Sequence, residues 1–387
     1  MTEETAEAIV SRSIVNGWII PFLWRFGTVV GGLLTVAVGL LYAKQDSLLY
    51  FPAIGEVPRR PGQNPRGYRS PAEHQIPYET HMIRCSDGVS IHSWLLLHPH
   101  SLEKKVPTLL FFHGNAGNIG LRLPNALQMF QYLEANVLMV EYRGYGDSDD
   151  CTPSEAGLKL DAEAALQFIR THTKVDPNRI FAFGRSLGGA VAFHLAQYAE
   201  RNGIPLAGIL VENTFLSISS MVDALMPFVA PLKPLVLTLD WNSGKIAPQL
   251  RVPVLYLAGK EDELVPPYHM RELYEASAKA SQCARIHVVE RGTHNDTWLK
   301  GGKRYWEVIR IFLSDSCDRD NSSSDGGGGG GAYVRSGVAG NAVDVQNEAN
   351  AIPLMPTNLV GMAKEATVSA AAASSVETGR VAVKKDL

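Results

Sequence analysis

Phe181–Ala190 reads Phe-Ala-Phe-Gly-Arg-Ser-Leu-Gly-Gly-Ala, an apolar run that leads directly into a Gly-x-Ser-x-Gly pattern. A helix-prone run, Ala190–Gln197, follows it. The order strand, sharp turn, helix lifts a serine hydroxyl above the end of a sheet and aims a helix N-terminus at it. Gly184 and Gly188 suit that turn, because its backbone segments approach too closely for a Cβ. The stretch predicts that Ser186 is a nucleophile, with a structural glycine turn as the alternative.

A nucleophilic serine needs a base, a carboxylate behind the base and donors for the oxyanion. In a strand–turn–helix site of this kind, the acid and then the histidine follow the serine along the chain. Asp262 meets this requirement, because it lies in the loop after the strand-like run Val252–Ala258. Glu212 is a rival, since it comes directly after the run Gly208–Val211. The longer loop around Asp262 has more reach and favours Asp262 as the acid.

Three histidines come after Asp262 in the chain. His287 lies inside a strand-like run, and His269 opens a predicted helix. His294 lies in a turn between the last predicted strand and the closing helix. A histidine on a loop at that place can swing over the serine, so His294 is predicted to be the base.

The oxyanion donors are expected from two backbone segments. One is the N–H of Leu187, the residue after the nucleophile, and the other lies in the loop after an earlier strand. The apolar run Pro107–Phe112 is such a strand, and residues 113–118 after it read His-Gly-Asn-Ala-Gly-Asn. Asn115 is the predicted second donor, whereas His113 is expected to pack within the turn and to take no part in catalysis.

Strand-like and helical runs alternate through the middle of the chain. A hairpin signal at Ser86–Gly88 joins two strands, Glu79–Arg84 and Val89–Leu97. Thr152–Glu155 has the pattern of a capping box that opens a helix to about Thr171. The alternation predicts a mainly parallel sheet with helices on both faces. The further strand-like runs are Thr108–Phe112, Val137–Glu141, Arg179–Phe183, Ala207–Val211, Val254–Ala258 and Arg285–Val289.

Residues 26–43 contain no charged side chain and are bracketed by Arg25 and Lys44. A helix of this length spans roughly 27 Å, close to the ~30 Å of a bilayer's hydrocarbon core. One transmembrane helix is therefore predicted after an N-terminal segment of residues 1–25. A cleaved signal peptide is the alternative, but the start of the chain is acidic. Gly27–Gly31 is a GxxxG pattern, which would let two such helices pack as a homodimer.

Residues 47–315 are predicted to form one globular domain. Within it, residues 217–244 break the alternation with an apolar run that contains three prolines. We expect this run to be a small lid-like insertion, with ordinary helix packing on the sheet as the alternative. Residues 316–387 include the glycine run Gly326–Gly331 and are predicted to be a disordered tail.

The overall composition excludes several function classes. The net charge is −3 and the basic residues are scattered, so nucleic acid is not an expected partner. The four cysteines form no Cys-x-x-Cys pair, so no metal site is expected, and no cofactor is predicted either. These cysteines are Cys85, Cys151, Cys283 and Cys317.

Several segments together resemble the alpha/beta-hydrolase domain-containing protein 13 group, also called the Bem46-like hydrolases. They are Gln45–Pro52, Phe111–Gly120, Leu123–Ala126, Tyr142–Gly146, Phe183–Val191, Val211–Ser217 and Gly292–Trp298. The resemblance covers about residues 26–313 and implies an α/β-hydrolase fold with a single membrane span. It implies Ser186 as nucleophile, Asp262 as acid and His294 as base, but it supplies no substrate. It also favours a cytosolic N-terminus, with the hydrolase on the far side of the membrane.

These features predict a single-pass membrane serine hydrolase that cleaves an ester or thioester through an acyl-enzyme. The expected partners are the lipid bilayer and a small-molecule, lipid or acyl-protein substrate. The expected location is the endomembrane system or the plasma membrane. The alternatives are a catalytically silent hydrolase fold that serves as a membrane scaffold, and a serine peptidase. The presence of every part of the site argues against the scaffold.

Overall fold

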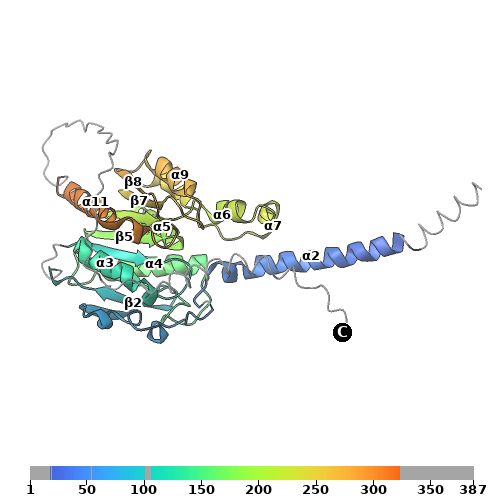
Figure 1. Ribbon diagram of the computed structural model, residues 1–387, viewed down its shortest axis with the longest axis horizontal. Coiled ribbons are helices and arrows are strands. Elements are labelled where there is room, and N and C mark those ends of the chain that lie inside the picture. Colours follow the sequence, from blue (N-terminus) through green and yellow to red (C-terminus); the bar gives the residue numbers. More distant parts are fainter. Residues whose placement is uncertain (1–17, 19, 54, 101–105, 323–387) are drawn as a thin grey trace, which may run out of the picture. The chain divides into compact units, whose positions relative to one another are not determined.

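The computed structural model describes residues 18, 20–53, 55–100 and 106–322 (Figure 1). The chain divides into two compact units. One unit combines the N-terminal part of the chain, up to Leu49, with Ile218–Asp240. The other unit holds Tyr50–Ser217 and the chain from Trp241 onward. Most of the predicted N-terminal segment 1–25 and of the predicted tail lies outside the described residues.

An eight-stranded sheet forms the centre of the larger unit (Figure 1). Its strand order is β1-β2-β4-β3-β5-β6-β7-β8. β2 runs antiparallel to β1 and β4, and every other neighbouring pair is parallel. The predicted α/β-hydrolase fold is therefore confirmed. The strands are β1 Tyr78–Arg84, β2 Ser90–Leu96, β3 Thr108–Phe112, β4 Asn136–Val140, β5 Ile180–Arg185, β6 Gly208–Glu212, β7 Val254–Gly259 and β8 Ala284–Val289.

Helices cover both faces of this sheet. Successive residues of a strand point to opposite faces of the sheet. The helices that contact two neighbouring residues of one strand therefore lie on opposite faces. Leu255 of β7 belongs to the hydrophobic cluster that α3 and α11 share, whereas Tyr256 packs against Phe193 of α5 and Tyr274 of α9. The helices of this unit are α3 Leu123–Leu133, α4 Glu155–Arg170, α5 Leu187–Arg201, α8 Ser243–Ile246, α9 Tyr268–Ser277, α10 Thr297–Lys300 and α11 Gly302–Ser322.

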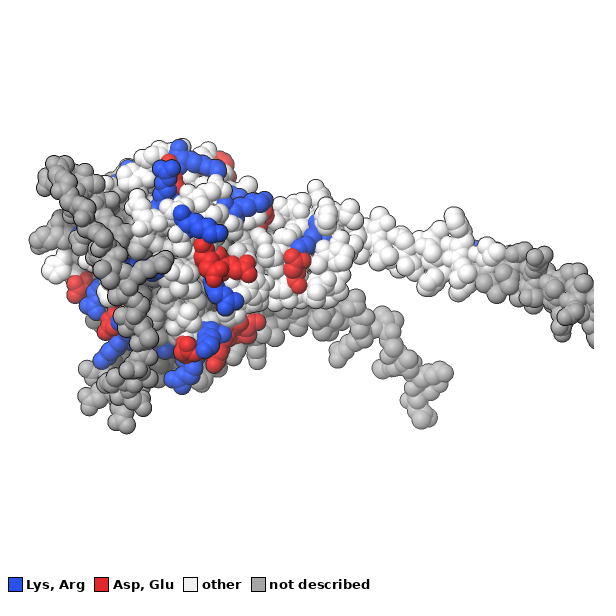
Figure 2. All heavy atoms as spheres, turned by 90° about the horizontal axis from the view of Figure 1, so that it is seen from above, with Lys and Arg blue, Asp and Glu red and all other residues white. Residues whose placement is uncertain are grey.

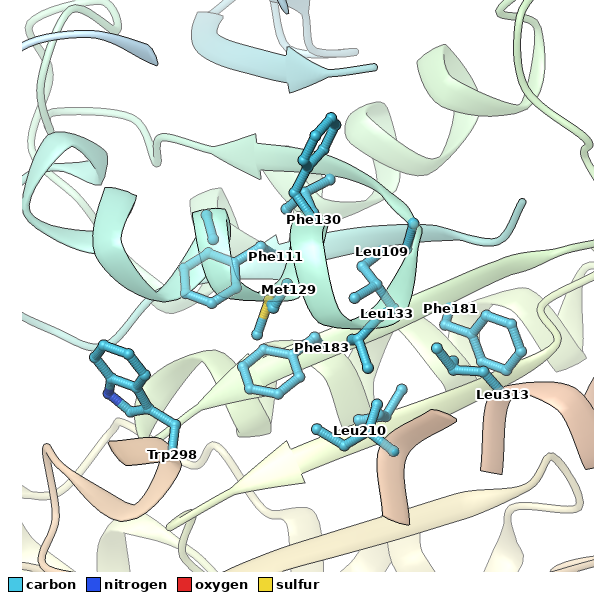
Figure 3. Packing of buried hydrophobic residues seen from close by; sticks show 14 of the residues in the cluster. Leu109, Phe111, Met129, Phe130, Leu133, Phe181, Phe183, Leu210, Trp298 and Leu313 are labelled. Atoms are coloured by element: carbon cyan, nitrogen blue, oxygen red, sulfur yellow. The ribbon is translucent and has the colours of Figure 1, made fainter. Parts of the chain in front are cut away.

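The central strands are buried on both faces, which explains why their sequences are continuously apolar. The register places Phe111 of β3 opposite Phe183 of β5, and their rings stack with centroids 5.4 Å apart. Figure 3 shows this pair among Met129 of α3 and Leu210 of β6. The core thus fixes the positions of β3, β5 and β6, whose carboxyl ends carry the candidate site.

The smaller unit contains α2 Ile20–Leu49, α6 Ile218–Leu225 and α7 Lys233–Val236. α2 extends past both ends of the predicted span 26–43. It is long and apolar enough to cross a membrane. Its most apolar stretch of 18 residues has a mean hydropathy of 1.9, and none of that stretch is buried. Short 3₁₀ turns occur in both units: η2 Pro61–Gln63, η3 Pro71–His74, η5 Ile119–Arg122, η6 Ala230–Leu232 and η7 Ala247–Gln249.

One predicted helix start is wrong, and α11 extends past the predicted end of the globular domain. α4 begins at Glu155, and its N-cap is Ser154, whose Oγ accepts the Gly157 N–H at 3.2 Å. The predicted cap, Thr152, lies outside the helix, because the side chain that accepts a first-turn N–H is that of Ser154, two residues later. At the other end of the domain, α11 continues to Ser322, past the predicted boundary at residue 315.

The position of this cap is testable. Ser154→Ala should lower the free energy of unfolding by about 1 kcal/mol, because one N–H of the first turn of α4 loses its acceptor. Thr152→Ala is the matched control and should leave it within about 0.5 kcal/mol of wild type. Urea unfolding followed by tryptophan fluorescence measures both. The assignment of the cap to Ser154 fails if the Thr152 variant is the less stable of the two.

Candidate active site

Ser186 is the single residue between the end of β5 and the start of α5. Its backbone has φ 53° and ψ −119°, a conformation that costs a residue with a side chain about 1–3 kcal/mol. A Cβ at Gly184 would collide with the backbone of Gly188, and a Cβ at Gly188 would collide with the carbonyl of Phe112. The turn therefore requires glycine at both positions, as the sequence predicts.

Residues after β6 hold this strained turn. The Ser186 N–H donates to the Glu212 carbonyl at 2.9 Å, and Thr214 Oγ1 donates to the Ser186 carbonyl at 2.7 Å. A Cβ at Gly189 would collide with the Thr214 side chain, so the start of α5 also packs closely on Thr214. Both polar groups of the Ser186 backbone are thus satisfied, which stabilises its conformation.

A histidine–carboxylate pair lies at the same edge of the sheet. Asp262 follows β7 and His294 follows β8, and His294 Nδ1 is 2.9 Å from Asp262 Oδ2. Both residues are buried, with 5% of His294 and 8% of Asp262 exposed. Asp262 Oδ1 also accepts the N–H groups of Leu264 and Val265, at 2.9 and 2.8 Å. The carboxylate is therefore fixed by its own loop, and it orients the imidazole with Nε2 left as the second ring nitrogen.

Of the three predicted site residues, Asp262 and His294 are joined by a direct hydrogen bond. Ser186, Asp262 and His294 all follow parallel strands at the carboxyl edge of the sheet. Among the described residues, however, no hydrogen bond joins the Ser186 hydroxyl to the His294 imidazole. The serine turn and the histidine loop are instead connected through two consecutive residues, Asn213 and Thr214.

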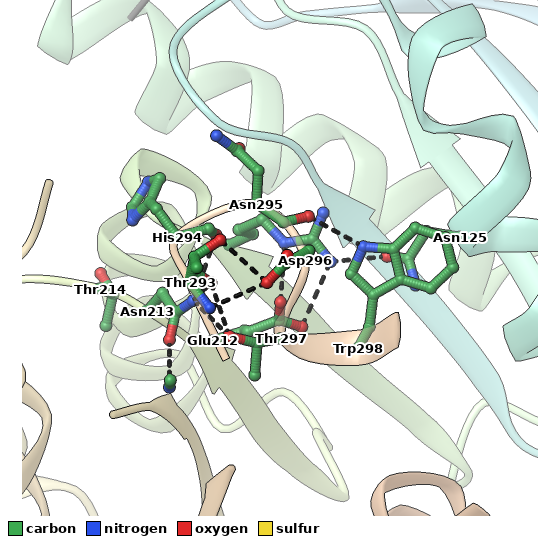
Figure 4. Close-up of polar contacts among 12 residues, drawn as sticks. Asn125, Glu212, Asn213, Thr214, Thr293, His294, Asn295, Asp296, Thr297 and Trp298 are labelled. Carbon is green, nitrogen blue, oxygen red and sulfur yellow. Dashed lines mark hydrogen bonds and ion pairs between the residues drawn. The ribbon is translucent and has the colours of Figure 1, made fainter. Parts of the chain in front are cut away.

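Asn213 is the centre of the polar network drawn in Figure 4. Its Nδ2 donates to the carbonyls of Thr293 and His294, both at 3.1 Å, and to Thr297 Oγ1 at 2.9 Å. Its Oδ1 accepts the Gly259 N–H at 2.8 Å. This side chain ties the loop of the histidine to the end of β7. The sequence predicts no role for Asn213, although a Glu-Asn-Thr triplet at the end of a buried strand was a usable signal.

Glu212, the rival acid, does not face the histidine loop. Its carboxylate binds Arg185 through two bonds of 3.0 and 3.2 Å and accepts the Tyr305 hydroxyl at 2.5 Å. Arg185 also donates to Asn125 Oδ1 at 2.9 Å. Because these buried partners occupy both oxygens, Glu212 holds the residue before Ser186 in place, and the alternative of Glu212 as the acid is excluded by geometry.

The loop of residues 113–118 passes beside the serine. A Cβ on Gly114 would lie 3.8 Å from the Ser186 Cβ. Two buried tyrosines fix the loop: Tyr142 donates to the His113 carbonyl at 2.9 Å, and Tyr145 donates to the Asn115 carbonyl at 2.7 Å. The predicted oxyanion loop and the predicted nucleophile are therefore neighbours.

The segment that follows α2 also supports this loop. The Phe51 N–H donates to the Asn115 carbonyl at 2.9 Å and to Tyr145 Oη at 3.0 Å, and the Gly117 N–H donates to the Phe51 carbonyl at 2.9 Å. Phe51 forms a parallel bridge with Ala116. A residue about sixty positions upstream thus completes the backbone pairing of the loop, which no local pattern in the sequence predicts.

The other histidines near the site have structural surroundings. His113 is fully buried with Nδ1 2.7 Å from the Gly114 carbonyl, and burial lowers its pKa to about 3, so its predicted packing role is confirmed. His269 is buried in α9 and accepts the Leu216 N–H at 3.1 Å, and burial lowers its pKa to about 4. His287 lies within β8, as predicted.

One cluster among the described residues has metal-ligand types. Nε2 of His81 and Nε2 of His172 each lie 3.0 Å from Glu79 Oε2. Lys174 Nζ is 2.7 Å from the other carboxylate oxygen and supplies the positive charge that a cation would bring. Glu79 and His81 lie on the edge strand β1, whereas His172 and Lys174 follow α4, and we interpret the cluster as an ion-pair network.

The fold and the strained serine turn define the class of protein, the α/β hydrolases. The sequence profile described as "Alpha/beta hydrolase family" matches residues 109–250. The esterase Pf2001 of Pyrococcus furiosus superposes with a TM-score of 0.53 at 16% identity, covering 67% of this chain and 99% of its own. An α/β hydrolase of Vibrio vulnificus superposes with a TM-score of 0.53 at 20% identity, covering 72% and 93%. At these identities the likeness shows the fold alone.

More similar sequences narrow the class to one family. The alpha/beta hydrolase domain-containing protein WAV2 of Arabidopsis thaliana is 38% identical over 73% of this chain and 92% of its own. Protein bem46 of Schizosaccharomyces pombe is 37% identical over 73% and 89%. An uncharacterized membrane protein of Saccharomyces cerevisiae is 33% identical over 75% and 98%. The chain therefore belongs to the Bem46 family of α/β hydrolase domain proteins, as the sequence motifs predict.

Asn213→Gly tests the connection between the Ser186 turn and the loop that carries His294. Asn213 has φ 48°, and glycine keeps that conformation without strain while it removes the side chain. We expect the rate of covalent labelling by a fluorophosphonate to fall about tenfold or more, because the histidine loop loses its alignment. The exposed Asn202→Gly is the matched control and should label at the wild-type rate. Equal rates for both variants would contradict the role of Asn213.

Glu141→Gln tests a buried acid that contacts the residue after the predicted oxyanion loop. Both carboxylate oxygens of Glu141 accept the Ile119 N–H at 3.2 Å, and burial raises its pKa to about 8. The unfolded-state pKa of a glutamate is near 4.3. Between that pH and the folded-state pKa of about 8, Glu141 holds a proton in the folded protein that it has lost in the unfolded chain. The free energy of unfolding therefore falls as the pH rises through this interval, by at most ~1.4 kcal/mol per pH unit. The glutamine side chain removes that dependence.

The measurement is urea unfolding of both proteins between about pH 5 and pH 8. The stability of Glu141→Gln relative to wild type should increase with pH across this interval. The exposed Glu275→Gln is the control and should show no such trend. Parallel pH profiles for wild type and Glu141→Gln would mean that Glu141 is ionised in the folded protein.

Proposed function

We propose that this protein is a membrane-anchored serine hydrolase that cleaves an ester or thioester bond. Ser186 is the nucleophile, His294 the general base and Asp262 the acid that orients it. The observation that carries the proposal is the strained Ser186 turn, which lies beside the loop of residues 113–118 while a buried carboxylate holds His294. Strain of this kind persists only where surrounding contacts impose it, and it clusters at reacting groups.

The first half of the reaction forms an acyl-enzyme. A rotation of the Ser186 side chain brings Oγ to His294 Nε2, since catalytic hydrogen bonds are often long before substrate binds. Oγ attacks the carbonyl carbon as Nε2 takes its proton, and Asp262 stabilises the imidazolium. The N–H groups of Leu187 and Asn115 receive the oxyanion. The carbonyl re-forms, the bond to the leaving alcohol or thiol breaks, and the imidazolium gives that group its proton.

The second half consumes water. His294 removes a proton from water, whose oxygen attacks the Ser186 ester at the same carbonyl and displaces Oγ. The imidazolium then returns a proton to Oγ, which restores the free serine and releases the carboxylic acid. Every step uses side chains and backbone groups of this chain, and none needs a cofactor.

The substrate class is inferred from the composition of two segments of the chain. Residues 26–43 of α2 are uncharged, and the insertion between β6 and β7 is largely apolar. A relative from Saccharomyces cerevisiae is named as a membrane protein, and Pf2001 is named as an esterase. These features support a lipid ester or an acylated protein as the substrate. Neither the fold nor the likenesses favour a peptide bond, and the complete set of site residues argues against a silent scaffold.

Ser186→Ala tests the proposal. Loss of Oγ should reduce kcat for a short p-nitrophenyl ester and a thioester by on the order of 10⁴-fold or more, because no other group forms the acyl-enzyme. Fluorophosphonate labelling should disappear. The far-ultraviolet circular dichroism and the unfolding midpoint should remain near those of wild type, since the substitution removes one partly exposed hydroxyl.

Ser86→Ala, on the exposed turn between β1 and β2, is the matched control and should keep full activity. A Ser186→Ala protein that labels at the normal rate would refute Ser186 as the nucleophile. A wild-type protein that neither labels nor hydrolyses either ester would support the scaffold instead.

A further inference from the structure

One side chain of α2 holds the insertion between β6 and β7. Gln45, near the end of the helix, donates through Nε2 to the Val236 carbonyl at 3.1 Å. Its Oε1 accepts the N–H groups of Thr238 and Leu239, at 2.8 and 3.0 Å. A single amide thus satisfies three backbone groups of a segment that lies about 190 residues further along the chain. The insertion and the helix belong to one compact unit.

The position of Gln45 on α2 indicates its depth relative to the membrane surface. Residues 26–43 are uncharged, and Lys44 is the first charged residue after them. A lysine at the end of a membrane span reaches the headgroup layer with its ammonium. Gln45 follows Lys44 directly, so backbone groups bound to Gln45 lie at the level of the membrane surface when α2 crosses the bilayer.

The insertion that Gln45 binds exposes large apolar side chains. The exposed fractions are 76% for Phe228, 69% for Leu235 and 48% for Leu225. By contrast, Val236 and Leu239, next to the backbone groups that Gln45 binds, are buried. The apolar residues of this segment therefore divide into a set packed within the unit and a set that faces outward. An exposed group of large apolar side chains marks an interaction surface.

Charge on the insertion is largely neutralised internally. Lys233 Nζ lies 2.6 Å from both carboxylate oxygens of Asp223 and donates to Ser219 Oγ at 3.0 Å. The remaining charged residue between 218 and 240 is Asp240, at the very end. Figure 2 shows charged side chains gathered over the globular part of the chain and a nearly white surface along the described part of α2. A surface of this composition suits lipid better than a charged protein partner.

We propose that Leu225, Phe228 and Leu235 form a membrane-binding surface that enters the boundary between headgroups and acyl chains beside α2. The occupant is the lipid bilayer, because the surface continues directly from a helix that is itself apolar enough to span it. An in-plane apolar segment of this kind adds contact area to a single anchor. The inference rests on the membrane span of the proposed function. A substrate with an acyl chain in the bilayer is compatible with such a surface.

The test uses the full chain in phosphatidylcholine nanodiscs. Cys151→Ser and Cys283→Ser remove the partly exposed native thiols, and Phe228→Cys carries an environment-sensitive nitrobenzoxadiazole label. We expect blue-shifted emission and quenching about twofold or more stronger by lipids with a nitroxide near the headgroup than by lipids with a nitroxide deep in the chain. Leu235→Cys should behave in the same way.

Two control positions separate the possible failures. A label at Leu33→Cys, inside the span, should be quenched most by the deep nitroxide, and a label at the exposed Glu275→Cys by neither. If the Leu33 label is not quenched, the membrane span itself is wrong. If the Leu33 label is quenched while the Phe228 label emits as in water, the surface does not enter the bilayer. A Phe228 label with blue-shifted emission that neither nitroxide lipid quenches would show that protein covers this position. That result would also overturn the proposal.

A functional readout accompanies the labelling. The double variant Phe228→Ser, Leu235→Ser should lower the turnover of a long-chain ester embedded in the nanodisc several-fold, as less of the insertion contacts lipid. Hydrolysis of a short soluble p-nitrophenyl ester should stay at the wild-type rate. Equal loss on both esters would point to a disturbed fold. An unchanged rate on the embedded ester would show that this surface does not serve delivery of the substrate.

Discussion

The close approach of three chain segments around Ser186 is the constraint on which the site depends. The turn leaves no room for a Cβ at Gly184 or Gly188, and it forces a positive φ on a residue that needs its side chain. Such a turn relaxes unless its backbone groups are bound from outside. The carbonyl of Glu212 and the hydroxyl of Thr214 supply those bonds, and both come from the end of β6.

The end of β6 therefore organises more than the Ser186 turn. Asn213, between these two residues, also has a positive φ, and its amide binds the loop that carries His294. Two strained residues thus lie within one polar junction at the carboxyl edge of the sheet. Each costs about 1–3 kcal/mol, and together the hydrogen bonds of the junction offset a cost of that size. The Ser186 turn and the His294 loop are aligned through backbone groups, so their relative position does not depend on a direct contact between the two side chains.

The sequence predicts the elements that rest on local patterns. All eight strands follow from apolar runs and turn residues, and Ser186, Asp262 and His294 follow from chain order. What it misses depends on contacts between distant segments. Asn213 meets His294 across 81 positions, and Gln45 meets Val236 across 191. The predicted start of α4 was wrong for a local reason, since Thr152 and Ser154 can both cap a helix and the sequence pattern does not choose between them.

The buried pair of Arg185 and Glu212 shows how the turn resists relaxation. A buried ion pair is weak evidence for stability, because desolvation of both charges offsets much of their attraction. Its effect here is geometric. Arg185 immediately precedes Ser186, and its guanidinium binds β6 through Glu212 and α3 through Asn125, while Tyr305 of α11 binds the same carboxylate. Any movement of Arg185 would unpair a charge at a buried position, so the strained conformation of Ser186 is the one that keeps the Arg185–Glu212 pair intact.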